Sequence, residues 1–322
     1  MNEQGTNVLE QYDLEVFLTG RGIGAVLCET NDGLKLLKEC RAPAGRIEAE
    51  ARCKEALSDT LRLDGYVRNR EGGLVSVDEE EIPYTLRNWF DGRECSTREE
   101  REMAEAVRLL ARFHRAAQRL PEEWTSGLGR APVLRNVFDR HNRELRRART
   151  YIRNTVQKSE FELCVIRSYE RFYAQAERAF FLLQKMEDVP AEHLCHGEFT
   201  QHHVLMDRDG AALVDFSRAG LGVQVSDLYL FLRKMMEKNN WNRELGEKLL
   251  AAYEEVRPLT KTERRYLYLL FLYPEKYWKQ INYYYNANKA WIPGRNIGKL
   301  TALEEQFDAR EDFLAWLDRE TV

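Results

Sequence analysis

The fold of this chain is decided at residues 195–205, which read Cys-His-Gly-Glu-Phe-Thr-Gln-His-His-Val-Leu. A turn, a short apolar stretch and then Asp215 and Phe216 follow at hairpin distance. A phosphoryl-transfer site needs a carboxylate near the acceptor hydroxyl and oxygen ligands that hold Mg²⁺ on the nucleotide phosphates. Glu198 and Asp215 would supply two such carboxylates from this one segment of the chain. The segment therefore predicts a phosphoryl-transfer centre at 194–216.

Composition describes a globular chain without membrane spans. Of the 322 residues, 43% are hydrophobic and 32% are charged, and the formal net charge is -4. The longest strongly apolar run, 266–273, is far shorter than the ~20 residues that cross a bilayer. The six cysteines are scattered without a Cys-x-x-Cys pair, which favours reduced thiols over a disulfide framework. Because the opening residues are polar and slightly acidic, we expect synthesis in the cytoplasm without a signal segment. The net charge argues neither for nor against nucleic acid, and we expect neither a nucleic-acid nor a membrane partner.

Residues 1–90 have the pattern of a small β-sheet with one helix. Short apolar runs alternate with turn residues, and the Asn-Asp-Gly sequence at 31–33 favours a tight hairpin turn. Helix-forming residues fill 46–57. The expected strands are 13–18, 25–29, 34–39, 74–77 and 84–89. This pattern predicts a β-rich lobe at the start of the chain.

After residue 95 the pattern turns helical, apart from the hairpin at 194–216. Ser96 and Glu99 form the sequence signature of a capping box, and apolar residues then recur at helical spacing. The last expected helices are 226–238, 243–255, 261–289 with a break near Pro274, and 297–318. The prediction is an α+β, two-lobed, kinase-like fold. It has a β-rich N-lobe at 1–90, a hinge at 91–95 and a large, mostly helical C-lobe at 96–322.

A glycine triplet and a lysine in the N-lobe are candidates for phosphate binding. The triplet Gly20-x-Gly22-x-Gly24 lies between two expected strands, where backbone N–H groups can approach phosphates. Lys38 lies on a following strand, and a kinase-type lysine pairs with phosphate and with a helix glutamate, here Glu50 or Glu48. Glycines in a hairpin are more often a plain turn, and a lysine at a strand end is usually solvated, so both interpretations stay open.

The chain resembles the aminoglycoside/choline phosphotransferase superfamily and, within it, the CotS-type spore-coat family of endospore-forming bacteria. The resemblance covers nearly the whole chain and includes the hairpin segment. Its further motifs are Gly33-Leu-Lys-Leu-Leu-Lys38, the hinge Trp89-Phe-Asp-Gly-Arg-Glu-Cys95, Leu110-Ala-x-Phe-His114, Asp227-Leu-Tyr-x-Phe-Leu-Arg-Lys234 and the tail Tyr273-Pro-Glu-Lys-Tyr-Trp-Lys279, continuing to Pro293. The superfamily implies a protein-kinase-like fold that binds ATP between the lobes, near Trp89 and Asp91 of the hinge. The CotS-type subgroup implies association with spore-coat proteins.

Two of the three chemical positions of the superfamily pattern are changed. Its members carry His-Gly-Asp, then an Asn, then an Asp before Phe, whereas this chain has Glu198, His203 and the intact Asp215. The longer glutamate displaces the catalytic carboxylate, and a misplacement of about 1 Å can cost about a hundredfold in rate. Mg²⁺ prefers oxygen ligands in octahedral geometry, and an imidazole replaces them poorly. We therefore expect a catalytically degenerate kinase, a pseudokinase, that acts as a binding or structural component of the coat.

An active ATP-dependent kinase for a small hydroxylated molecule is the alternative. Glu198 would then be the base, Lys38 would meet the phosphates, and Asp215 would hold the metal. If His203 were a further ligand, Mn²⁺ would suit the site better than Mg²⁺. ATP with either ion is thus the cofactor to test.

Three further patterns have a functional and a structural interpretation. One short stretch gathers the ligand types of a transition-metal site, although their spacing matches no closed four-ligand pattern: His193, Cys195, His196, His202 and His203. The basic segment 130–158 either docks an acidic partner or is a solvated helix face. Tyr277, Ile281, Tyr284 and Asn288 share a helix face that is either core or a partner surface.

Overall fold

The computed structural model describes residues 6–22, 24–286 and 294–320. The expectations for Ile23 and for 287–293 of the tail lie outside these residues. The chain divides into two units. The first comprises Met1–Arg130, Ala191–Leu228 and Ala251–Arg257, and the second comprises Ala131–Pro190, Tyr229–Leu250 and Pro258–Val322. The division into lobes at 1–90 and 96–322 with a hinge at 91–95 stays a prediction.

The first unit contains a six-stranded antiparallel sheet. Its strands are β1 (Val16–Gly22), β2 (Ala25–Thr30), β3 (Gly33–Glu39), β4 (Tyr66–Val67), β5 (Ser76–Val77) and β6 (Pro83–Asn88), in the order β1-β2-β3-β6-β4 with β5 also on β6. Gly33 takes a φ of 81°, which glycine adopts without steric cost, so the Asn-Asp-Gly signal does mark the β2–β3 turn. The expected strands are confirmed in place, but the first begins only at Val16 and the fourth only at Ser76.

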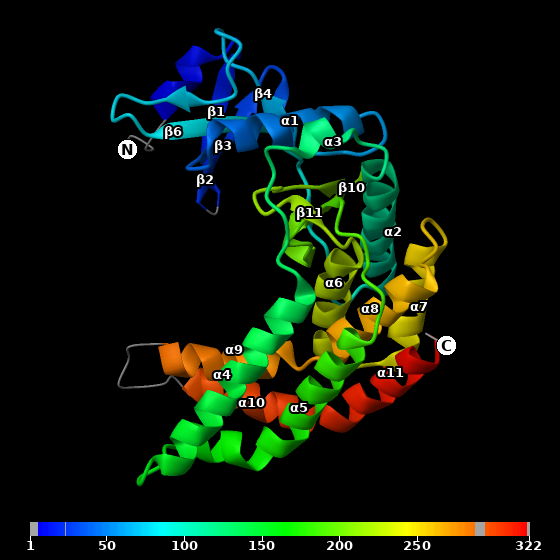
Figure 1. Ribbon diagram of the computed structural model, residues 1–322. Helices are drawn as coiled ribbons and strands as arrows, with labels where there is room; N and C mark the ends of the chain where they lie inside the picture. The colour runs from blue at the N-terminus through cyan, green and yellow to red at the C-terminus, as the bar shows by residue number, and fades with distance from the viewer. Residues whose placement is uncertain (1–5, 23, 287–293, 321–322) are drawn as a thin grey trace. The chain divides into compact units, whose positions relative to one another are not determined.

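A short helix and a long one complete the N-terminal part. Residues of η1 (Thr6–Gln11) pack with strand residues in one apolar cluster: Val8, Leu9, Tyr12, Cys28, Leu37, Tyr84 and Leu86. The helix α1 (Ala44–Leu57) lies beside the sheet and buries Ile47 and Ala51 against Leu74 (Figure 1). An antiparallel sheet followed by a mostly helical chain confirms the predicted α+β, kinase-like fold class.

Two small sheets carry the predicted hairpin. β7 (Arg93–Glu94), β9 (Val204–Asp207) and β10 (Gly210–Leu213) form one, and β8 (His193–Cys195) pairs with β11 (Gly220–Gly222) in the other. Between β8 and β9 lies the 3₁₀ turn η2 (Gln201–His203). The hairpin prediction at 194–216 therefore agrees with the observed β9–β10 pair.

The capping box predicted at Ser96 and Glu99 is wrong. The helix α2 (Glu100–Ala117) begins later, and Glu99 is its N-cap without a side-chain hydrogen bond. The Ser96 hydroxyl instead accepts from the backbone N–H groups of Arg98 and Glu99, at 3.2 and 3.3 Å. In a capping box the Glu99 side chain would accept the hydrogen bond of the Ser96 backbone N–H. Here Glu102, three residues later, accepts it at 2.9 Å. A short helix, α3 (Glu122–Thr125), follows α2.

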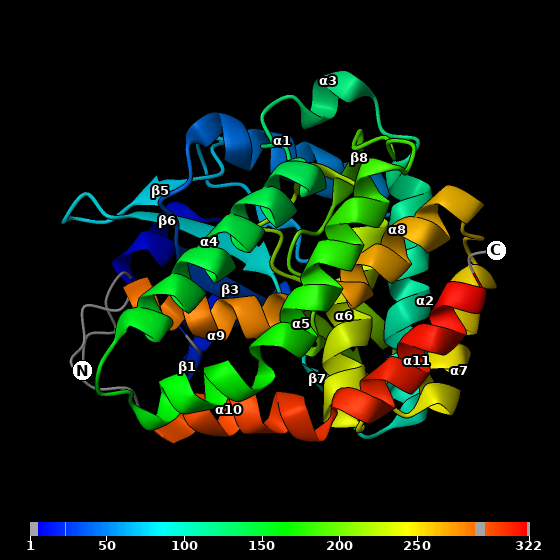
Figure 2. The same ribbon diagram turned by 60° about the horizontal axis from the view of Figure 1, so that its bottom comes forward.

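The second unit is helical. It contains α4 (Leu134–Asn154), α5 (Glu160–Gln184), α8 (Lys261–Leu272), α9 (Glu275–Asn286), α10 (Gly294–Glu305) and α11 (Phe307–Arg319), while α6 (Val225–Lys238) and α7 (Arg243–Glu254) each have residues in both units. Within this unit α4 contacts α5 and α9, and α10 contacts α5 (Figure 2). The predicted break near Pro274 is confirmed between α8 and α9. The single helix predicted at 297–318 is wrong, because the chain leaves helical geometry at Gln306.

Helix character and the state of the cysteines can be read directly from the described residues. Among the residues that the structure describes, no helix combines the length and apolar character needed to cross a membrane. No disulfide joins the cysteines of the described chain, and five of the six are buried. Burial raises the pKa of the Cys95 thiol to about 12, which makes it a poor nucleophile at neutral pH.

Candidate active site

Asp227 holds the loop that carries the His-Gly-Glu sequence. Its Oδ2 accepts from the backbone N–H of His196 at 2.6 Å, and its Oδ1 accepts from that of Gly197 at 2.9 Å. Gly197 has a φ of 80°, and a Cβ placed there would lie 2.1 Å from the carbonyl oxygen of Arg218. Glycine is therefore required at this position for both its backbone conformation and its missing side chain. The buried Asp227 side chain and the close approach of the Arg218 backbone fix the loop.

His196 connects this loop to the strand before Asp215. Its Nε2 lies 3.0 Å from the carbonyl oxygen of Val214, to which it donates. The ring is fully buried, and burial lowers its pKa, so the neutral imidazole is the form the fold accommodates. His196 therefore acts as a structural tie between the two halves of the hairpin.

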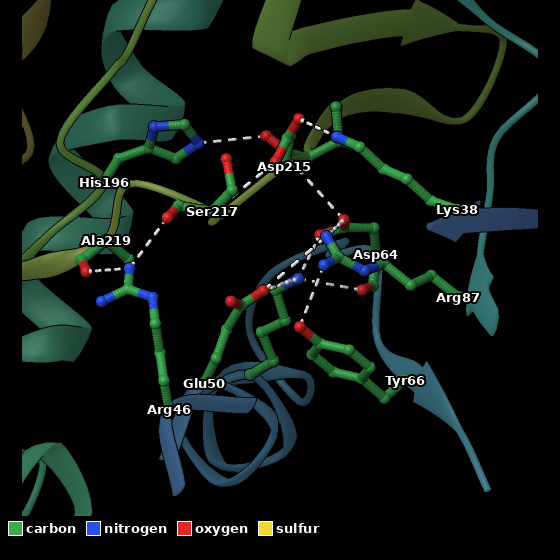
Figure 3. A network of polar contacts seen from close by, with 12 residues as sticks. Lys38, Arg46, Glu50, Asp64, Tyr66, Arg87, His196, Asp215, Ser217 and Ala219 are labelled. Atoms are coloured by element: carbon green, nitrogen blue, oxygen red, sulfur yellow. Dashed lines mark hydrogen bonds and ion pairs between the residues drawn. The ribbon is translucent and has the colours of Figure 1, made fainter. Parts of the chain in front are cut away.

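Asp215 is held by a cation from the N-terminal sheet. Lys38 on β3 places its Nζ 2.9 Å from Oδ2 of Asp215 (Figure 3), and the Ser217 N–H donates to Oδ1 at 3.2 Å. Burial alone would raise the pKa of Asp215, but the hydrogen bond and charge of Lys38 hold it well below the usual range. The carboxylate is thus an anion whose charge Lys38 neutralises.

These two residues line a cleft of about 380 Å³ within the first unit, a volume suited to a small ligand. Apolar side chains from both sheets form part of its wall: Ala25, Leu27, Leu36, Leu205 and Val214. Gly22 and Trp89, two of the predicted nucleotide-binding residues, also line it. Polar groups on the wall are Lys38, Asp64, Arg87, Glu94, His202, His203 and Asp215. The structure thus brings Gly22, Lys38, Trp89, His203 and Asp215 together around one cavity.

Three other predicted nucleotide-site residues, Gly20, Gly24 and Asp91, are not among the residues that line this cleft. Gly20 is paired with Leu27 in the β1–β2 ladder, and Gly24 sits in the turn with a φ of 67°. Asp91 is exposed in the turn before β7. Of the three glycines, Gly22 is therefore the one that lines the cleft, where it pairs with Ala25 at the end of the β1–β2 ladder.

The two changed chemical positions have partners of their own. The Glu198 carboxylate is more than half exposed and lies 4.0 Å from Nε of Arg218. The Nδ1 of His203 lies 3.2 Å from the Thr200 hydroxyl, and its backbone carbonyl accepts from the Val214 N–H at 3.0 Å. The imidazole of His203 therefore faces the cleft on a rigid backbone, where an oxygen ligand would be needed for Mg²⁺.

The expected pair between Lys38 and Glu50 is replaced by a buried charge cluster. Glu50 on α1 pairs with Lys54 one turn later, at 2.9 Å. It also lies 3.7 Å from Arg87 on β6 (Figure 3). Lys54 also pairs with Asp64 at 2.8 Å. All four charged side chains are at least nine-tenths buried. Lys54 and Arg87 therefore take the Glu50 carboxylate that was expected to orient Lys38.

The transition-metal interpretation is not supported. In the described parts of the chain, no group of three or more His, Cys, Asp and Glu side chains is arranged to hold a metal ion. His196 bonds to a carbonyl, and His202 pairs through Nδ1 with Glu94 at 2.6 Å. Cys195 is buried within β8. The rings of His196 and His203 do lie 5.2 Å apart between centroids, but within the described residues they are not joined by a third ligand in a metal-binding arrangement.

Several residues of the basic segment and of the aromatic face have partners within the protein, and the docking interpretation of each stays untested. On α4, Arg143 pairs with Asp139 and Arg146 donates to the Tyr173 hydroxyl at 2.9 Å, as on a solvated helix face. On α9, Tyr277 and Ile281 are core residues that are almost completely buried. Tyr284 stacks on Phe161 with ring centroids 4.5 Å apart. Asn288 lies outside the described residues.

Comparison with known proteins agrees with this geometry. The sequence model described as the phosphotransferase enzyme family matches residues 25–266, which is more than half of the chain. The chain belongs to the phosphotransferase enzyme family. The match begins at β2 and ends within α8, so it contains Lys38, the hairpin and Asp227.

Solved structures of family type share the fold. An aminoglycoside phosphotransferase from Alicyclobacillus acidocaldarius is 17% identical with a TM-score of 0.88, covering 100% of this chain and 97% of that one. A spectinomycin phosphotransferase bound to AMP is 12% identical with a TM-score of 0.65, covering 95% of each chain. An amicoumacin kinase in complex with AMP-PNP, Ca²⁺ and Ami is 12% identical with a TM-score of 0.60, covering 97% of this chain and 94% of that one. At these identities the likeness concerns the fold, and membership of the CotS-type subgroup stays a prediction.

Sequence reasoning missed three buried charged residues, two of which, Asp64 and Arg87, line the cleft. Asp64, Lys54 and Arg87 were assigned no role, although each is at least nine-tenths buried. One signal was available, because Glu50 and Lys54 are spaced i,i+4 on a single helix and so can pair. Arg87 inside the apolar strand 84–89 was a second signal, since a charge there must find a partner when buried.

Proposed function

We propose that this family member binds a nucleotide in the described cleft but has lost efficient phosphoryl transfer, and that it serves as a binding component of a spore coat. The observation that carries the proposal is the composition of the cleft wall. Lys38 and Asp215 form an ion pair of 2.9 Å on this wall, and His203 lies on the same wall, at the position where the superfamily pattern has an asparagine. In this proposal the residues of the cleft wall still bind a nucleotide, but they no longer form a complete Mg²⁺ site.

The cleft residues fit a nucleotide. Leu36, Leu205 and Val214 offer apolar walls for a flat base, and Lys38 offers a cation for phosphate oxygens. Bound nucleotide would supply the transferable phosphoryl group, and Lys38 would neutralise its charge. The spectinomycin phosphotransferase and amicoumacin kinase structures that share the fold hold AMP and AMP-PNP. These features support ATP as the cofactor.

The metal fits less well. The Asp215 carboxylate suits Mg²⁺ or Mn²⁺, whereas the imidazole of His203 is a poor Mg²⁺ ligand and a better one for Mn²⁺. Glu198, at the base position, is one methylene longer than the aspartate of the superfamily and is exposed beside Arg218. Both departures support weak or absent transfer rather than loss of binding.

The place of action rests on the sequence motifs. The hinge at 89–95 and the tail at 273–293 carry the resemblance to CotS-type spore-coat proteins. In this proposal the chain is made in the cytoplasm and recruited to coat proteins, and loss of transfer is tolerated because binding is the function.

Titration calorimetry with ATP and either Mg²⁺ or Mn²⁺ tests the proposal. Wild type would be compared with Glu198→Asp/His203→Asn, which restores the superfamily residues. We expect wild type to bind ATP with little effect of Mg²⁺, and the restored variant to gain Mg²⁺-dependent binding. Absence of nucleotide binding in both proteins would overturn the nucleotide part. Glu198-dependent transfer of the γ-phosphate by wild type to a component of cell extract would overturn the loss of catalysis.

The second candidate is an active kinase for a small hydroxylated acceptor. It is favoured by the exposed carboxylate of Glu198, which remains accessible to an acceptor. In this case Glu198 takes the acceptor proton, and Mn²⁺ supports turnover better than Mg²⁺ because of His203. ATP consumption that requires Mn²⁺ and disappears in Glu198→Gln would favour this candidate over the first.

A further inference from the structure

Asp64 is a completely buried carboxylate between α1 and β4 to which no catalytic or binding role has been assigned. Three groups converge on it: Lys54 Nζ lies 2.8 Å from Oδ1, Arg87 Nη1 lies 3.2 Å from Oδ2, and the backbone N–H of Asp215 donates to Oδ2 at 3.1 Å. The third contact matters most, because it joins this buried carboxylate to the residue at the metal position of the cleft (Figure 3).

Asp215 needs such a restraint. Its φ is 60°, a left-handed conformation that aspartate adopts more readily than most residues but that still costs free energy, which the surrounding structure must offset. The chain just before Asp64 also runs along the strand that leads to Asp215. Leu63 and Leu213 form a parallel bridge, and the Leu213 N–H donates to the Arg62 carbonyl at 2.9 Å. Residues 62–64 therefore run beside residues 213–215 and are bonded to their backbone.

The cluster around Asp64 is balanced in charge and anchored on α1. Two carboxylates, Glu50 and Asp64, face two cations, Lys54 and Arg87, so each buried charge has an opposite partner. From the same helix Arg46 donates to the carbonyls of Ser217 and Ala219, at 2.9 and 2.7 Å. The helix thus contacts the chain after Asp215 directly through Arg46, and it reaches the Asp215 backbone through Asp64, even though Glu50 is not paired with Lys38.

We propose that Asp64 is a positioning residue that sets the backbone of Asp215 and thereby couples α1 to the metal side of the cleft. Glu50 and Lys54 take part through Asp64 rather than through Lys38. The use of this geometry in ligand binding rests on the proposed nucleotide function, whereas the restraint itself is a property of the ligand-free protein.

The restraint is tested without any ligand, by NMR hydrogen exchange of the Asp215 amide in protein labelled with ¹⁵N-aspartate. The variant is Asp64→Leu/Lys54→Met, which removes the acceptor and one cation together, so that no new net charge is buried. The control is Arg62→Met/Asp207→Asn, which removes a neighbouring ion pair on the same segment. We expect exchange at Asp215 to quicken about tenfold in the variant and to stay within about twofold in the control. Unchanged exchange in a folded variant would overturn the proposal.

Should this variant fail to fold, Asp64→Asn provides the same readout, because its side chain keeps the shape but can turn its NH₂ group towards the Asp215 amide. ATP titration with and without Mn²⁺ then separates two roles for Asp64. A positioning role weakens binding about tenfold with the metal and within about twofold without it. Equal weakening in both titrations would mean direct contact with the nucleotide and would overturn the positioning role. If wild type binds no ATP, the proposed function fails while the exchange result still decides the role of Asp64.

Discussion

Lys38 on β3 and Asp215 after β10 form an ion pair of 2.9 Å, so the phosphate-binding and metal-binding candidates of the cleft neutralise each other in the ligand-free protein. Their side chains are about one third and one quarter exposed, respectively. When a nucleotide phosphate binds Lys38 and a cation binds Asp215, the ion pair between these two side chains must break or be shared with the ligands. The pair therefore links the two binding events through one contact.

The acid sensitivity of this pair can be predicted. The pKa of Asp215 lies below its ordinary value of 3.8, so its stabilising effect is complete above that pH and is lost as the pH falls through the folded-state pKa. Lys38→Met removes the main favourable contact, and we expect a smaller loss of stability below pH 3.8 than in wild type. Thermal unfolding at pH 6, 4 and 3 measures this, with the exposed Arg41→Gln as control. Equal acid sensitivity in wild type and Lys38→Met would contradict the prediction.

Gly197→Ala should destabilise the first unit strongly. The added Cβ would lie 2.1 Å from the Arg218 carbonyl oxygen, and the φ of 80° is unfavourable for alanine. We expect a loss of about 3 kcal/mol or more in the free energy of unfolding, measured by urea denaturation. Gly45→Ala in α1 is the matched control, because a Cβ there meets nothing within 4 Å and should change stability by less than about 1 kcal/mol. Similar losses in the two variants would show that the close approach at Gly197 is unimportant.

Asp227→Asn should loosen the loop that carries Glu198. The carboxylate accepts from two backbone N–H groups, and His114 Nε2 lies 3.3 Å from its Oδ2. An amide presents an NH₂ group to at least one of these donors, so we expect a loss of about 3 kcal/mol. Urea denaturation measures it, and Asp209→Asn in the exposed β9–β10 turn should have little effect. A stability equal to that of wild type would mean that Asp227 does not anchor the loop.

His141 should make the second unit sensitive to mild acid. Its ring stacks on Trp278 with centroids 3.3 Å apart, and burial lowers its pKa from 6.5 to about 4. Below pH 6.5 the unfolded chain binds the proton more readily than the folded one, so stability falls as the pH drops towards 4. His141→Phe keeps a stacked ring without a charge and should reduce this loss, by at most about 3 kcal/mol. Tryptophan fluorescence during unfolding at pH 7 and pH 5 measures it, and identical pH profiles would contradict the assignment.

Features that depend on neighbouring residues were predictable. The β2–β3 turn follows from an Asn-Asp-Gly sequence, because only a few residue types tolerate positive φ. The break between α8 and α9 follows from Pro274, which lacks an N–H and disfavours helix in the residue before it. The hairpin before Asp215 was also predictable from adjacent residues, because two apolar stretches flank a turn that ends in Gly210.

The sequence by itself thus determined the α+β class, the places of most strands and helices and the residues that could do chemistry. The tertiary structure decided how those residues pair. Lys38 binds Asp215 rather than Glu50, Glu50 is taken by Lys54, and Asp64 holds the Asp215 backbone from far away in the chain. An ion pair or a backbone contact of this kind depends on distance in space and on burial, because a charge removed from water is stable only where an opposite charge lies within a few ångströms. Separation along the chain carries no record of that distance, so only the folded arrangement could assign these partners.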